Sequence, residues 1–266
     1  MSGTNNPTGK PILTKKLDHF LLIVYNGFIF LLRFFREVLK PPYEGKEILR
    51  QCYQIGYKSL GLITLTGFIT GIVFTKQSRP SLSEFGATSW LPSLVGIAII
   101  RALAPLVTSL ICAGKVGSSL GAELGSMRVT EQIDAMEVSA VNPFKYLVVS
   151  RVLACTITIP LLMSYTAFVS LMGSYLDVHL TEQTSLQLFF QNAFERISFL
   201  DFIMSIIKAL AYGFTIGIVG CYQGFNASQG TEGVGKAANT SVVLSMFLIF
   251  IEEIVIVQFF NSFRTV

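Results

Sequence analysis

Residues 92–113, PSLVGIAIIRALAPLVTSLICA, are the stretch that decides the class of fold. The stretch carries one charged residue, Arg101, in an otherwise apolar setting. It exceeds the roughly 20 apolar residues that an α-helix needs to cross the hydrocarbon core of a bilayer. The sequence therefore predicts a membrane-spanning helix here.

Similar apolar blocks occupy most of the chain on both sides of this stretch. Of the 266 residues, 52% are hydrophobic and only 14% are charged, whereas a soluble domain carries charge on about a quarter of its residues. We therefore predict an all-α integral membrane protein with five transmembrane helices. The five predicted spans are 55–75, 92–113, 146–176, 202–221 and 242–260.

Pro160 and the loop after the third span add two local expectations. Pro160 removes one backbone hydrogen bond inside the third span and clashes with the preceding turn, which favours a kink. The loop 177–201 faces the side opposite the N-terminus, and residues 185–194 within it favour a short helix.

The N-terminal part combines a short apolar run with basic residues. Residues 20–32 are too few to cross the membrane alone, and Arg33, Arg36 and Lys40 continue the run on one helical face. This pattern favours a helix lying in the membrane interface, which Pro41-Pro42 would end. The alternative is that these residues form a first short span. The run is not followed by the small-residue cleavage site of a signal peptide, so we expect no cleaved signal peptide. We predict a cytoplasmic N-terminus with an interfacial helix over 1–54 and a transmembrane domain over 55–266.

Lysine and arginine are unevenly distributed between the two sides of the predicted spans. Because these residues translocate poorly, the richer side is predicted to be cytoplasmic, and five spans then place Val266 outside. The cytoplasmic side would hold Lys10, Lys15, Lys16, Arg33, Arg36, Lys40, Lys46, Arg50, Lys115, Arg128, Lys145 and Lys236. The outer side would hold Lys76, Arg79, Arg196 and Arg264.

The segment after the second span has two parts with different sequence patterns. Gly117, Gly121 and Gly125 fall at i, i+4 and i+8, a side-chain-free stripe along which another helix can approach closely. This pattern favours helix packing and identifies no function by itself.

The second part predicts a short amphipathic helix over 130–138. Thr130 is a favourable N-cap, and Ile133 and Met136 share an apolar face. So small a face needs a partner, and a groove on a soluble protein with a basic rim would suit the acidic residues beside it. The alternative is that the face folds back on the membrane, against which its acidic residues argue, since the inner leaflet is negatively charged.

The runs Ala113–Gly117 and Ala122–Val138 (AELGSMRVTEQIDAMEV) closely resemble the signature of MlaE-type ABC transporter permeases. Gly230–Ala237 (GTEGVGKA) is similar to the glycine-rich cytoplasmic loop of that family. The resemblance covers the chain from the N-terminal interfacial helix to the last span. It implies that residues 114–143 are the coupling segment, which contains the helix seated on an ATPase. The candidate coupling residues are Glu123, Arg128, Thr130, Glu131, Gln132, Ile133, Asp134, Met136 and Glu137.

The same resemblance implies a function and a set of partners. It implies a permease in a bacterial inner membrane that exchanges phospholipid with a periplasmic MCE-domain protein, in lipid trafficking to or from the outer membrane. It further implies a homodimer with two cytoplasmic ABC ATPases, which would bind ATP and Mg²⁺. The chain itself has no Walker loop, so we expect no ATPase activity and no cofactor of its own.

Charged residues inside the predicted spans are candidates for the lipid path. A charge at this depth costs at least about 2.5 kcal/mol unless it faces protein or water. Arg101, Lys208 and Glu252 are the candidates. An acidic residue often follows this arginine in the family, but Ala102 stands here, which puts a paired-charge role in doubt. Arg101 could meet a lipid phosphate or pair with Glu252 or Glu253.

Two other classes of function fit the sequence less well. An ion-coupled secondary transporter or channel would use Arg101, Lys208 and Glu252 as an ion path, but the sequence has no evident internal repeat. The second class is an intramembrane enzyme, but the sequence lacks the usual motifs for nucleophilic or metal catalysis. Its four cysteines are too far apart in the sequence to indicate a metal site. The dispersed charge predicts no nucleic-acid partner.

Overall fold

The computed structural model describes residues 12–41 and 44–264, with helices throughout and no strand among these residues. The all-α prediction is therefore confirmed. Lys10, Pro42 and Val266 lie outside the described residues, and so do the side chains of Lys15, Lys16 and Arg264.

The chain divides into two compact units, residues 1–43 and 44–266. The described part of the first unit, residues 12–41, contains one helix, α1 (Ile12–Val38), which ends before Pro41. Leu21, Leu22 and Tyr25 are among its exposed apolar side chains, as expected of a helix that contacts lipid. The predicted interfacial location stays a prediction.

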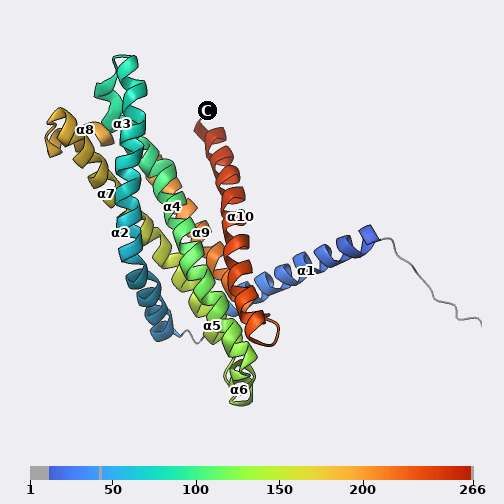
Figure 1. Cartoon of the computed structure of the whole chain (residues 1–266). Coiled ribbons are helices and arrows are strands. Elements are labelled where there is room, and N and C mark those ends of the chain that lie inside the picture. Colours follow the sequence, from blue (N-terminus) through green and yellow to red (C-terminus); the bar gives the residue numbers. More distant parts are fainter. Residues whose placement is uncertain (1–11, 42–43, 265–266) are drawn as a thin grey trace, which may run out of the picture. The chain divides into compact units, whose positions relative to one another are not determined.

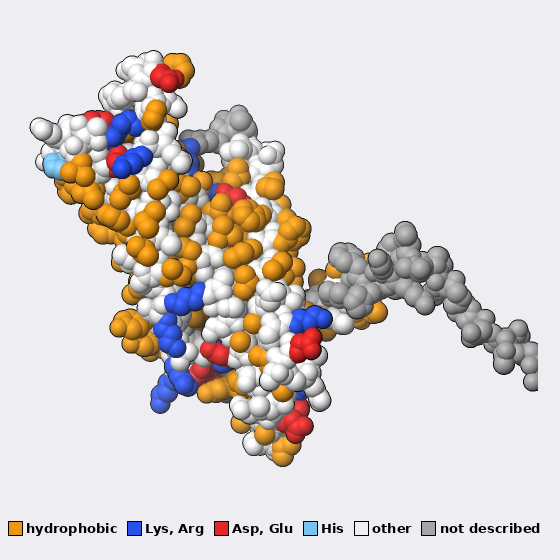
Figure 2. All heavy atoms as spheres, viewed as in Figure 1, with side chains coloured by type: hydrophobic (Ala, Val, Ile, Leu, Met, Phe, Trp, Pro, Cys, Tyr) orange, Lys and Arg blue, Asp and Glu red, His pale blue; other side chains and the backbone are white. Residues whose placement is uncertain are grey.

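Five helical segments of the second unit are long and apolar enough to cross a membrane, which confirms the predicted number. They comprise Gly45–Glu84, Thr88–Val129, Phe144–Glu182, Phe199–Phe225 and Thr231–Ser262. Figure 1 shows them side by side, with α6 at one end of the bundle and α8 at the other. In Figure 2 hydrophobic side chains dominate the middle of this unit's visible face, and charged ones lie mostly toward its ends.

The segments are built from the following elements. The first span is α2 (Gly45–Glu84). The second runs through η1 (Thr88–Trp90), α3 (Leu91–Ala98), η2 (Ile99–Leu103), α4 (Ala104–Cys112), η3 (Ala113–Gly117) and α5 (Ser118–Val129). After α6 (Gln132–Val138) come η4 (Phe144–Val149), α7 (Ser150–Glu182), α8 (Leu186–Glu195), α9 (Phe199–Phe225) and α10 (Thr231–Arg264).

Every helix that was expected as a span is longer than its apolar block. On α2 the buried side chains recur every fourth residue from Glu47 to Thr75, so the helix packs on α7 well before the apolar block begins at residue 55. Close approach is possible because Gly71 lies against the backbone of Ser170 and Gly173 against that of Phe68. Tertiary packing, and not apolar composition, therefore sets the start of this helix.

Two local expectations can be compared with the fold. The short helix predicted after the third span is present as α8, where the Ser185 hydroxyl accepts a hydrogen bond from the Leu188 N–H over 3.3 Å. α7 continues through Pro160 as one helix, and the kink predicted at this residue stays a prediction.

Candidate functional site

The second span is interrupted at its middle by the π-helical turn η2, which carries Arg101. Pro105 follows and has no N–H, so it cannot bond to the carbonyls of Ile100 and Arg101, five and four residues before it. Side chains of α9 bond to both: the Ser205 hydroxyl lies 2.6 Å from the Ile100 oxygen, and Lys208 Nζ lies 3.0 Å from the Arg101 oxygen. The irregular turn is thus held by two polar residues of the neighbouring helix.

Two ion pairs extend from this turn. Arg101 Nη2 lies 2.7 Å from Asp201 Oδ2, and Lys208 Nζ lies 2.6 Å from Glu253 Oε1. The Tyr212 hydroxyl donates to the other carboxylate oxygen of Glu253. The Lys208 side chain is only 1% exposed, so its charge needs its two partners, the Arg101 carbonyl and the Glu253 carboxylate.

These pairs line a cavity of about 580 Å³, which we call the charged cavity. Its polar wall contains Arg101, Asp201, Lys208 and Glu253, and its apolar wall comes from α9 and the last turns of α10. The apolar lining residues are Ala102, Leu200, Met204, Val257, Phe259 and Phe260. The site therefore joins charged groups to an apolar surface in one hollow.

The arrangement differs in two respects from the pairing that the sequence suggested. Arg101 pairs with Asp201, not with Glu252 or Glu253, because the π-helical turn faces the start of α9. Glu253, and not Glu252, lines the charged cavity; Glu252 accepts a hydrogen bond from the Thr215 hydroxyl. The two adjacent glutamates point to different partners, as their helical separation requires.

Asp201 was missed because it was assigned to the loop before the fourth span. A sequence signal was available, since Ser198 and Asp201 form a capping box at the start of α9. The Ser198 N–H donates to Asp201 Oδ2 over 2.9 Å, and the same oxygen meets Arg101. The capping residue of α9 thereby positions the guanidinium.

The glycine stripe lies against α10. A Cβ added at Gly121 would lie 3.0 Å from the Ala237 oxygen, and one added at Gly125 would lie 3.5 Å from the Val234 Cα. The Gly117 carbonyl accepts a hydrogen bond from the Ser241 hydroxyl over 2.9 Å. A second stripe on α9, which the sequence analysis did not single out, brings Gly213 and Gly217 against α7.

At the other end of the bundle, the predicted helix over 130–138 is shorter than expected. Thr130 is not an N-cap, because α5 continues to Val129 and the Thr130 hydroxyl donates back to the Ser126 oxygen over 2.8 Å. The chain turns at Glu131, whose φ of 59° is left-handed, and α6 then spans Gln132–Val138 without a side-chain cap. The propensity of Thr for capping was overridden by continuation of the preceding helix.

The apolar face of α6 is partly covered by the chain itself. Ile133 is 1% exposed and lines a pocket together with Phe225, so the expectation that a separate protein would bury Ile133 is wrong. Met136 is half-buried, whereas Val138 at the end of the helix is 90% exposed. The surface that α6 offers to another molecule is therefore Val138 with the exposed polar residues around it.

Ion pairs hold three of the remaining candidate coupling residues, Glu123, Arg128 and Asp134. Arg128 Nη1 lies 2.6 Å from Asp134 Oδ1 and links α5 to α6. Glu123 Oε2 lies 3.6 Å from Arg151 Nη2, which adds a buried arginine outside the predicted coupling residues. Glu131, Gln132 and Glu137 are exposed. No group of three or more metal-ligating side chains lies together in the described part of the chain.

Comparison with known proteins shows to which family this chain is similar. The family described as "Permease MlaE" matches residues 48–259. A probable ABC transporter permease protein of Rickettsia prowazekii is 37% identical over 84% of this chain and 86% of its own length. A probable ABC transporter permease protein of Synechocystis is 32% identical over 82% of this chain and 83% of its own length. The chloroplastic protein TRIGALACTOSYLDIACYLGLYCEROL 1 of Arabidopsis thaliana is 31% identical over 84% of this chain and 64% of its own length.

Proposed function

Because this chain belongs to the MlaE permease family of ABC transporters, we propose that it is the subunit that carries phospholipid through an ATP-driven complex. As a permease subunit it is not itself the ATPase. Hydrolysis takes place on a separate cytoplasmic ABC subunit, and an MCE-domain protein receives or delivers the lipid on the opposite side.

The charged cavity is the observation that carries this proposal. A phospholipid has an anionic phosphate and apolar chains, and the cavity offers a guanidinium and an ammonium beside an apolar wall. Its volume of about 580 Å³ lies within the usual range of ligand sites, roughly 300–1,000 Å³. Arg101 Nε is buried without a hydrogen-bond partner among the described residues, so the guanidinium keeps a donor for a ligand.

The printed name of the Arabidopsis relative supports a lipid as the cargo. It contains the name of a galactolipid, trigalactosyldiacylglycerol, and the relative is similar over most of this chain. A molecule with acyl chains fits the apolar wall formed by Leu200, Met204 and Val257, where a small hydrophilic ion would find few partners.

The end of the bundle with α6 is proposed to contact the ATPase. Val138 would enter a groove on that protein, while Glu131 and Glu137 meet basic side chains at its rim. Arg128 and Asp134 hold α6 to α5, so a movement of the ATPase would be transmitted to the second span. The pair between the exposed Glu123 and the buried Arg151 would extend this link to α7.

The orientation and the assembly are part of the same proposal. The charge distribution supports a cytoplasmic N-terminus and α6 end, a periplasmic C-terminus, and residence in a bacterial inner membrane. The exposed apolar face of α10, with Phe247, Ile254 and Val255, suits either lipid or a second copy in a homodimer.

A pull-down of the tagged chain in mild detergent tests the proposal. Mass spectrometry of the bound proteins and extracted lipids should recover an ABC ATPase, an MCE-domain protein and phospholipid. The matched variants are Arg101→Gln, which should lose phospholipid, and Lys46→Gln, an exposed cation outside the charged cavity, which should not. A preparation without ATPase at native expression, with transport driven by an ion gradient, would replace the proposal with the ion-coupled carrier.

A further inference from the structure

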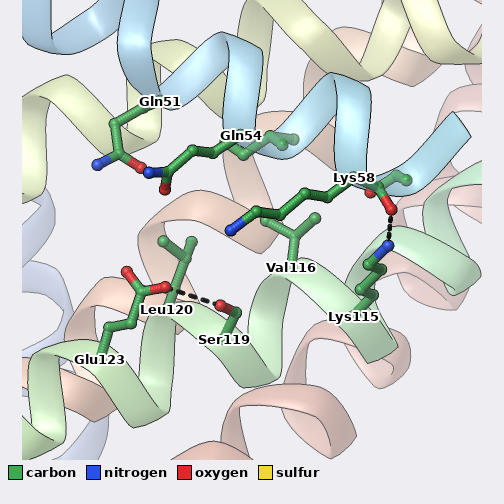
Figure 3. Close-up of a pocket in the computed structure, with 10 residues that line it drawn as sticks. Gln51, Gln54, Lys58, Lys115, Val116, Ser119, Leu120 and Glu123 are labelled. Atoms are coloured by element: carbon green, nitrogen blue, oxygen red, sulfur yellow. Dashed lines mark hydrogen bonds between the residues drawn. The ribbon is translucent and has the colours of Figure 1, made fainter.

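A second, smaller pocket lies between the first part of α2 and the junction of η3 with α5, the helix that leads to α6 (Figure 3). Its volume is about 60 Å³. One water needs roughly 10–15 Å³ of such space, so the pocket has room for a few waters or one small tetrahedral group. We call it the Lys58 pocket, after the lysine that crosses it in Figure 3.

Positive charge predominates in the Lys58 pocket. Lys58 and Lys115 both line it, and the one acidic lining residue is Glu123. Glu123 pairs with Arg151 over 3.6 Å and accepts a hydrogen bond from the Ser119 hydroxyl over 2.9 Å. Its charge is thereby offset from outside the pocket, and the two lysines leave a net positive site.

Hydrogen-bond donors remain available at this site. Lys115 Nζ donates to the Lys58 carbonyl, as the dashed line in Figure 3 marks, but an ammonium has three donors. Figure 3 shows the Lys58 amino group lying over Val116, on the side of Ser119 and Glu123. The Ser59 hydroxyl is buried at 1% exposure and has no hydrogen-bond partner among the described residues. An oxygen-rich anion would satisfy these groups together.

The depth of the Lys58 pocket indicates where such an anion comes from. Residues 59–75 of α2 carry no charge and span about 25 Å as a helix, close to the thickness of a bilayer core, so Lys58 stands at its edge. Tyr53 and Tyr57, one turn away, are stacked with ring centroids 5.2 Å apart and are each 64% exposed. Exposed tyrosines of this kind mark the headgroup level of a membrane.

We infer that the Lys58 pocket binds the phosphate group of an anionic membrane lipid, at a site separate from the charged cavity. The acyl chains of this lipid lie along the exposed apolar side of α2, where Leu62 and Leu65 are exposed. The bound lipid bridges α2 to α5, and α5 leads directly to α6. This inference does not depend on the cargo proposed for the charged cavity.

The test is a titration of the delipidated, detergent-purified complex with phosphatidylglycerol, followed by native mass spectrometry. Lys58→Gln with Lys115→Gln should weaken one binding event roughly 25-fold, because each basic residue near an anionic membrane surface contributes a factor of about five. Lys46→Gln with Lys236→Gln removes the same charge from two exposed positions outside the Lys58 pocket and should leave that event unchanged. Lipid bound in the charged cavity is common to all variants, so it does not account for a difference in affinity between them.

Two arms identify the source of the phosphate and protect the test against misfolding. Phosphatidylcholine and inorganic phosphate should bind this site at least tenfold more weakly than phosphatidylglycerol. Tight binding of inorganic phosphate that depends on Lys58, without that of the lipid, would overturn the inference in favour of a free anion. Lys58→Gln alone changes an exposed side chain and should still weaken the event about fivefold. Equal affinity in wild type and both lysine variants would also overturn it.

Discussion

The ion pair between Lys208 and Glu253 can be dissected by a double-mutant cycle. The variants are Lys208→Met, Glu253→Leu and the two combined. Each single change leaves one charge inside the bundle with reduced compensation, since Glu253 keeps only the Tyr212 hydroxyl and Lys208 keeps only the Arg101 carbonyl. The double change removes both charges and leaves an apolar contact of similar volume.

The expected magnitudes follow from the burial of the two side chains. Removing one partner of a buried pair costs about 3–5 kcal/mol, and the 19% exposure of Glu253 places each single variant near 3 kcal/mol. The double variant loses the hydrogen bond to the Arg101 carbonyl, about 1 kcal/mol, together with a repacking cost below about 1.5 kcal/mol. Its cost should therefore be at least 2 kcal/mol smaller than the sum of the singles.

Unfolding of the purified chain in mixed micelles with increasing dodecyl sulfate, followed by circular dichroism, measures these free energies. Lys46→Met is the matched control, because Lys46 is exposed on the same helix bundle and should change stability by less than about 0.5 kcal/mol. If the two single effects add to the double effect within about 0.5 kcal/mol, Lys208 and Glu253 are not coupled, and the polar wall of the charged cavity is wrongly described.

Three further predictions concern separate parts of the chain. Gly121→Val should destabilise by about 1–3 kcal/mol, because a Cβ would lie 3.0 Å from the α10 backbone, whereas Gly45→Ala meets no atom within 4 Å; equal effects in the same unfolding assay would contradict this packing. Glu137→Lys with Val138→Asp should reduce co-purification of the ATPase at least tenfold at unchanged stability, and undiminished recovery would remove α6 from the interface. Arg101→Gln should lower phospholipid retention in the charged cavity several-fold in lipid extracts; full retention would exclude its guanidinium as the phosphate ligand.

The number of spans and the place of the short helices could be predicted from the sequence because they depend on local composition. A long apolar block such as residues 92–113 has few alternatives to a transmembrane helix, since every backbone polar group must be satisfied within the segment. The loop helix α8 was predictable for a related reason, because Ser185 is a local cap. The start of α2 could not be predicted in this way, because its buried face continues into the polar residues Glu47 and Gln51.

The partners of the charged residues were decided by tertiary structure. A charged residue inside an apolar block requires a partner or water, and Arg101 and Lys208 could be identified as candidates for that reason. Which oxygen meets which cation depends on the rotation of each helix about its axis, and that rotation is set by the π-helical turn before Pro105 and by glycine contacts between helices. Asp201 was therefore found only in the fold, and Ile133 proved to be covered by the chain itself.

The sequence by itself thus determined that this chain has five helical segments able to span a membrane and that it belongs to the MlaE permease family. Only the tertiary structure decided that Glu253 and not Glu252 enters the charged cavity, and that Val138 is the large apolar residue that α6 leaves exposed. The physical reason is that hydropathy is a property of segments, whereas a site is made by side chains that converge from distant helices at fixed rotations.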